Sequence, residues 1–94
     1  MSSDVHLLIA KPLDRAVVVD RWIGGNGVRD RAFKVLRRPP DLKEDGLRSW
    51  SVSPAEALAI SEAHYGDGAT PDDVAALAAA FPADCHWWSI LDCY

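Results

Sequence analysis

Residues 53–56 are Ser-Pro-Ala-Glu and residues 70–73 are Thr-Pro-Asp-Asp, and these two stretches decide the second half of the fold. Each combines a capping hydroxyl, a proline at the first helical position and an acid three residues after the hydroxyl. They predict two short helices, over residues 54–65 and 71–81, because both starts satisfy backbone N–H groups that a helix leaves free.

The second of these helices carries a regular apolar stripe. Val74, Leu77, Ala78 and Phe81 recur at positions i, i+3, i+4 and i+7, which is the spacing of one helical face. Pro82 then ends the helix because it cannot continue the hydrogen-bond ladder. We expect this stripe to pack on a sheet.

The first half of the chain predicts β-strands. Residues 5–10 alternate in polarity and residues 16–23 are rich in β-branched and aromatic types, with a turn between them. A turn over residues 43–46 precedes a short strand over residues 47–52.

Residues 26–38 allow two interpretations. Asn26-Gly27 is a strong hairpin signal and predicts a return strand over residues 29–38, which Pro39-Pro40 would end. The alternative is a helix capped by Asn26, because the apolar residues of this segment also fit one helical face. We expect the strand.

The sequence therefore predicts a small α+β domain over residues 1–94. An antiparallel sheet is followed by two helices, and residues 85–94 form a final strand or a tail. No apolar run is long enough to span a bilayer and no secretion signal begins the chain, so we expect a cytoplasmic protein with no membrane contact.

The sequence contains none of the common catalytic signatures. The glycine-rich residues 24–27 follow a strand as a phosphate loop would, but Asp30 stands where the third glycine of a dinucleotide-binding loop belongs. Its charge would repel a pyrophosphate. We predict no catalytic residue, no enzymatic activity and no cofactor.

Cys85, His86, Asp92 and Cys93 form the best metal-binding candidate. Structural zinc sites usually bring their ligands in two closely spaced pairs, and this set does not. We predict free thiols and no metal, with a small metal-binding accessory protein kept as an alternative.

Trp87 and Trp88 would point to opposite faces of a final strand. One would then pack into the core and the other would be presented outward, where tryptophan is a frequent binding anchor. Both are candidate partner-binding residues.

Charge is distributed unevenly along the chain. All ten Lys and Arg residues lie at or before Arg48 together with seven acids, whereas seven acids and no base follow it. Of these later acids, Glu62, Asp67 and Asp84 lie away from the helix N-termini and are candidate partner-binding residues on an acidic helical face. The alternative is that this protein's own basic sheet neutralises them.

We expect no direct binding of nucleic acid, because the net charge is −4 and acids interrupt the basic residues 29–38. The sequence instead favours a non-catalytic protein–protein interaction module. Many small acidic α+β proteins of bacteria and phages are inhibitors, such as immunity proteins, antitoxins and anti-CRISPR proteins. The expected partner is a larger protein with a basic surface, for example a nuclease or a nucleic-acid-binding complex.

A second hypothesis for the function is a ribosomal peptide precursor. Residues 1–84 would then be a leader and residues 85–94, with their cysteines and aromatic side chains, would be the modified core.

Overall fold

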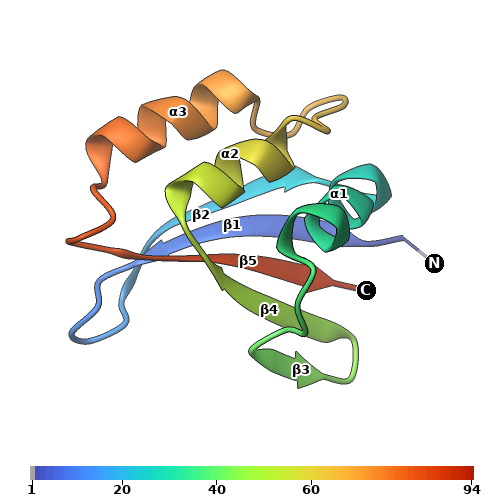
Figure 1. The fold of residues 1–94 in the computed structure, drawn as a ribbon, viewed down its shortest axis with the longest axis horizontal. Helices are drawn as coiled ribbons and strands as arrows, with labels where there is room; N and C mark the ends of the chain where they lie inside the picture. The colour runs from blue at the N-terminus through green and yellow to red at the C-terminus, as the bar shows by residue number, and fades with distance from the viewer. Residues whose placement is uncertain (1) are drawn as a thin grey trace.

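The computed structural model describes residues 2–94 and shows a five-stranded antiparallel sheet with three helices (Figure 1). The elements in chain order are β1 (Asp4–Ala10), β2 (Val17–Gly24), α1 (Asn26–Leu36), β3 (Leu42–Glu44), β4 (Leu47–Val52), α2 (Pro54–Ser61), α3 (Pro71–Ala80) and β5 (Trp87–Cys93). The strand order is β2-β1-β5-β4-β3. The predicted α+β class with an antiparallel sheet is confirmed.

The end of the chain forms the central strand. β5 pairs with β1 on one side and with β4 on the other, and both pairings are antiparallel. Of the two interpretations of residues 85–94, the strand is therefore the one that the structure shows.

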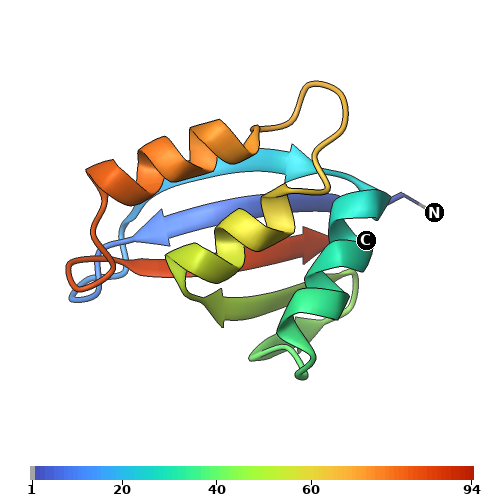
Figure 2. The ribbon, with the colours of Figure 1, turned by 45° about the horizontal axis from the view of Figure 1, so that its top comes forward.

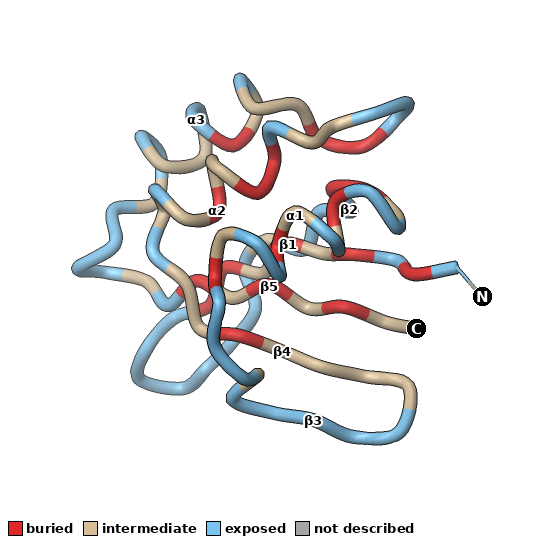
Figure 3. Tube along the Cα trace, turned by 45° about the vertical axis from the view of Figure 1, so that its right-hand side comes forward, coloured by how far each residue is buried: buried red, intermediate tan, exposed pale blue. Residues whose placement is uncertain are grey.

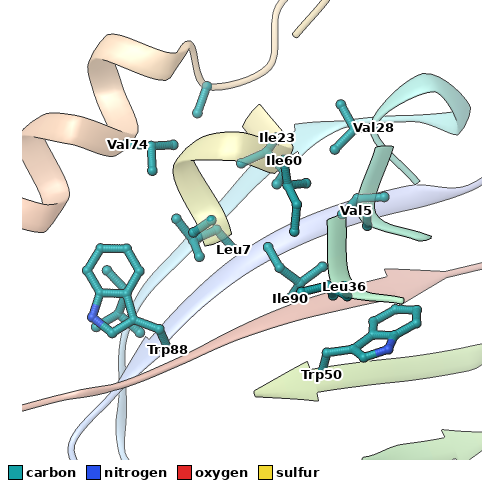
Figure 4. Packing of buried hydrophobic residues seen from close by; sticks show 14 residues of the cluster. Val5, Leu7, Ile23, Val28, Leu36, Trp50, Ile60, Val74, Trp88 and Ile90 are labelled. Atoms are coloured by element: carbon teal, nitrogen blue, oxygen red, sulfur yellow. The ribbon is translucent and has the colours of Figure 1, made fainter. Parts of the chain in front are cut away.

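All three helices lie on the same side of the sheet, as Figure 2 shows. Buried positions recur along the strands and on the helix sides that face them (Figure 3). The core contains Val5, Leu7, Ile9, Ile23, Trp50, Trp88 and Ile90 from the strands and Val28, Ala32, Leu36, Ala57, Ile60 and Val74 from the helices (Figure 4). The burial of these side chains supplies the main driving force for folding.

Both predicted capping boxes are present. The Ser53 hydroxyl accepts from the backbone N–H of Glu56 at 3.1 Å, and the Glu56 carboxylate accepts from the backbone N–H of Ser53 at 3.0 Å. Thr70 and Asp73 make the same reciprocal pair. In α3, Val74 is buried and the other residues of the predicted stripe are partly buried against the core.

The first of the two predicted helices ends earlier than expected. α2 stops at Ser61 rather than near residue 65, because the Ser61 hydroxyl donates to the carbonyl of Leu58 at 2.6 Å and the next N–H groups turn back by three residues. Bonds of this kind compete with continuation of an α-helix.

The predicted strand over residues 29–38 is wrong, because this segment forms α1. Val28, Ala32 and Leu36 are four residues apart, and the helix buries all three against the sheet. Asn26 does not form a hairpin turn. Its side-chain oxygen accepts from the backbone N–H of Ser3 at 2.7 Å, which ties the start of the helix to β1.

β3 is a strand that the sequence did not predict. It pairs with β4 through a tight turn in which Gly46 has a φ of 79°, a value that favours glycine. The turn itself lies within the predicted residues 43–46. Among residues 2–94, no helix is both long and apolar enough to cross a membrane.

Candidate functional site: the open face of the sheet

One face of the sheet carries no helix among residues 2–94 (Figure 2). Because successive side chains of a strand point to opposite faces, the strand pairings assign the residues of this surface. We call it the open face. Its residues are Asp4, His6, Leu8 and Ala10 of β1, Val17, Asp20 and Trp22 of β2, Leu42 and Glu44 of β3, Leu47, Ser49 and Ser51 of β4, and Trp87, Ser89, Leu91 and Cys93 of β5.

The middle of the open face is apolar. Leu8 and Leu91 lie on the two adjacent central strands and are half-buried, although no helix covers them. Trp22 and Trp87 lie on β2 and β5, and each remains 38% exposed. Two partly exposed indoles therefore share one surface with an aliphatic centre.

Trp87 is held by contacts within the chain. Its indole N–H donates to the hydroxyl of Ser51 at 2.9 Å, across the pairing of β4 with β5. The guanidinium of Arg15, from the turn between β1 and β2, lies 4.8 Å from the centre of the indole ring. This distance is within the range of a cation–π interaction.

Trp22 has a different environment. Its indole N–H donates to Asp4 at 3.2 Å, and beside it the carboxylate of Asp20 lies 2.8 Å from Nδ1 of His6. No Arg or Lys among residues 2–94 stacks on its ring. This end of the open face is therefore aromatic and acidic.

The charges of the open face are unbalanced. Asp4, Asp20 and Glu44 are all exposed, and among residues 2–94 none of them forms an ion pair with Arg or Lys. Arg15 is the one Arg or Lys among residues 2–94 that stacks on an aromatic ring of this face, that of Trp87. A surface of this composition attracts positive charge.

Trp87 and Trp88 were both candidates from the sequence. They lie on opposite faces of the sheet, as successive residues of a strand do. Trp87 lies on the open face, and Trp88 is only 1% exposed and belongs to the core. Trp88 is thus not available to a partner in the folded protein.

The three predicted acidic residues are not gathered at one place. Glu62 pairs with Arg31 of α1 at 3.0 Å. Asp67 precedes α3 and Asp84 follows it, so about 15 Å of helix separates them. Both are exposed.

The uneven distribution of charge along the sequence is largely balanced in space. Four of the seven acids that follow Arg48 form ion pairs with arginines of the first half of the chain. These pairs are Glu56–Arg38, Glu62–Arg31, Asp73–Arg21 and Asp92–Arg48. The alternative interpretation of the sequence was neutralisation by the protein's own basic sheet. Two of the four arginines, Arg21 and Arg48, lie on the sheet, whereas Arg31 lies on α1 and Arg38 lies in the loop after it.

Trp22 is a candidate site residue that was not predicted from the sequence. The same two-residue alternation that separated Trp87 from Trp88 would have identified it, because Ile23 next to it is a core residue.

The cysteines do not come together. Cys85 lies in a turn before β5 and Cys93 ends this strand, so they are separated by the length of β5, about 20 Å. Burial raises the pKa of the Cys93 thiol. Among residues 2–94, no three His, Cys, Asp or Glu side chains are grouped so that they could hold a metal ion.

A pocket of about 260 Å³ lies at the glycine-rich segment between β2 and α1. It is lined by Trp22, Gly24, Gly25, Asn26, Gly27, Val28, Ala63 and Tyr65. None of these residues carries a positive charge, and α1 has no side-chain cap at this end. The pocket therefore lacks the basic group that usually accompanies a phosphate site.

Comparison of this chain with known protein families, with curated proteins and with solved structures finds no match.

Proposed function

We propose that this protein is a non-catalytic protein-binding module and that the open face of its sheet is the binding surface. The observation that carries the proposal is that a face without helices displays both Trp22 and Trp87, each 38% exposed. Exposed apolar surface of this kind marks interaction sites, and tryptophan is enriched among residues that dominate binding.

The composition of the open face supports binding better than simple solvation. An antiparallel sheet that faces water usually alternates apolar residues inward with polar residues outward. Here Leu8, Leu91 and Leu42 stand on the outward side together with the two indoles. A partner would bury them and gain the corresponding hydrophobic free energy.

The open face also carries acids that can attract a basic partner. Four of the seven acids that follow Arg48 are paired within the chain. On the open face, Asp4, Asp20 and Glu44 have no Arg or Lys partner among residues 2–94, and they share that face with two partly exposed indoles. The proposed partner is therefore still a larger protein with a basic surface, such as a nuclease or a nucleic-acid-binding complex, and the proposed action is its inhibition.

The two other functions that the sequence suggested gain no support from the geometry. Residues 87–93 pair with strands on both sides, so a modified C-terminal segment would have to leave the middle of the sheet. Cys85 and Cys93 lie at opposite ends of β5, so they cannot bind one metal ion together.

The test is capture of partners from the native cells by tagged variants, quantified by mass spectrometry. Trp22→Ala and Trp87→Ala should each reduce capture of a specific partner at least about tenfold, the effect expected of a residue that dominates binding. Tyr65→Ala is the matched control, because Tyr65 is an aromatic residue that is 90% exposed and lies outside the open face. It should capture normally.

A triple variant tests whether the binding surface is the open face or the helical acids. Glu62→Lys, Asp67→Lys and Asp84→Lys combined in one chain should leave capture unchanged. If this triple variant loses the partner while both tryptophan variants retain it, the open face is not the binding surface and the helical acids are.

A further inference from the structure

We infer that the partner places an arginine side chain on the ring of Trp22, between the carboxylates of Asp4 and Asp20. The inference rests on the proposed function, because it names the chemistry that the open face recognises. It follows from a comparison of the two exposed indoles of that face.

The two indoles are equally exposed, but only one has a cation on it. At one end of the face, the chain's own Arg15 stacks on Trp87 at 4.8 Å. At the other end, no Arg or Lys among residues 2–94 stacks on Trp22. Among residues 2–94, an arginine therefore stacks on one of the two indoles and not on the other.

The surroundings of Trp22 are better suited to a cation than those of Trp87. Asp4 accepts the indole N–H at 3.2 Å through one oxygen, and its other oxygen has no partner among residues 2–94. Asp20 is 59% exposed in its side chain and contacts His6. A cation on the ring would gain the interaction with the aromatic face and the attraction of two carboxylates.

Arginine fits this arrangement better than lysine. Its planar guanidinium stacks on an aromatic ring and at the same time donates hydrogen bonds in its plane to carboxylates. The compact ammonium of lysine is more strongly hydrated and cannot stack. We therefore expect a clear preference between the two side chains.

The charge of the face disfavours a second copy of this chain as the occupant. Two open faces brought together would place six carboxylates, Asp4, Asp20 and Glu44 of each protomer, in one interface with only Arg15 of each protomer to balance them. Like charges held against one another cost free energy and oppose such pairing. A basic protein surface is complementary.

The test uses the intact, isotope-labelled chain and a probe that stands for the partner's side chain. The arginine probe is acetylated on its α-nitrogen and amidated at its carboxyl group, so that only the side chain is charged, and the lysine and glutamine probes are blocked in the same way. The arginine probe is titrated while the indole N–H signals of the four tryptophans are followed by NMR. The Trp22 signal should move in a saturable manner, with an affinity at least about threefold higher than for N-acetyl-lysine amide. Neutral N-acetyl-glutamine amide is the matched control and should give no saturable shift.

The variant Asp4→Asn/Asp20→Asn makes the test specific. Asparagine can still accept from the Trp22 indole and from His6, so the fold should be preserved, as the remaining spectrum will show. The affinity for the arginine probe should fall at least about fivefold, because the attraction of both carboxylates is lost. The inference is overturned if the affinity of this variant for the arginine probe equals that of the parent, or if the Trp22 signal of the parent does not move when the probe is added.

The outcomes for this inference and for the proposed function can be told apart. If Trp22→Ala and Trp87→Ala abolish partner capture but the arginine probe does not bind, the open face is the binding surface and its partner is recognised in another way. If both variants capture the partner normally, the proposed function fails and this inference fails with it.

Discussion

Nε of Arg48 lies 3.0 Å from Oδ2 of Asp92, and this carboxylate is buried in the helix-covered side of the sheet. The guanidinium of the same arginine lies over the rings of Tyr94, at 3.9 Å, and Phe33, at 5.0 Å. Arg48 on β4 and Asp92 on β5 are direct neighbours in the strand pairing. The pair thus joins two central strands through a charge contact within the core.

Removal of Arg48 alone should be strongly destabilising. Arg48→Met should lower the free energy of unfolding by about 3–5 kcal/mol, because it leaves the Asp92 carboxylate buried without a counter-charge. The double variant Arg48→Met/Asp92→Leu should be more stable than Arg48→Met, since an apolar pair replaces the lone charge. Urea unfolding measures both. A single variant as stable as the parent would show that Asp92 does not depend on Arg48.

The stability of Arg48→Met should recover in acid. Burial raises the pKa of Asp92, whereas Arg48 opposes this rise, so loss of Arg48 raises the pKa further. A carboxyl whose pKa is higher in the folded state favours folding when protonated, and this contribution is lost as pH rises through the folded pKa. The difference in stability between the variant and the parent should therefore shrink from about pH 7 to about pH 4. In Arg48→Met/Asp92→Leu, this dependence on pH should be absent.

Glu56 should have the opposite dependence on pH. The hydrogen bond from Arg38 holds the pKa of Glu56 below its ordinary value, and the backbone N–H of Ser53 adds to this effect. Its contribution to stability is present above the unfolded pKa and is lost as pH falls through the folded pKa. Glu56→Gln should cost about 0.5–1 kcal/mol at neutral pH and almost nothing in acid, as urea unfolding at several pH values can show. Glu62→Gln, whose carboxylate is more exposed, is the control and should cost less.

The neighbouring tryptophans should differ sharply in their effect on stability. Trp88→Ala should cost about 3–5 kcal/mol because it removes a large side chain from the core. Trp87→Ala loses a hydrogen bond to Ser51, a contact with Arg15 and the buried part of a side chain that is 38% exposed, which together should cost about 2 kcal/mol. Thermal unfolding of both variants compares them. Similar losses would mean that Trp87 contributes to the fold as much as Trp88 does.

Local chemistry explains which parts of the fold could be predicted from the sequence. The starts of α2 and α3 depend on hydrogen bonds between residues three apart, at Ser53 and Thr70, so the sequence contains all the information. The segment that forms α1 carries signals for both a turn and a helix. Burial of Val28, Ala32 and Leu36 against a sheet assembled from distant strands decides between them.

The candidate site also has one part that the sequence predicts and one part that it does not. Trp87 and Trp88 could be assigned to opposite faces because alternation is a property of any strand. That the outward face lacks a covering layer depends on where all three helices pack, and no local pattern reports this. The pairing of Glu62 with Arg31 likewise requires α1 to lie beside α2.

The central position of β5 has a consequence for folding during synthesis. The hairpin of β1 and β2 and the hairpin of β3 and β4 can each form early, but they are not neighbours in the sheet. Until residues 87–93 have left the ribosome, β1 and β4 lack the strand that pairs with both of them. One edge of each strand therefore has no partner. Such edges invite pairing with other chains. The nascent protein is therefore most exposed to misassembly just before residues 87–93 emerge.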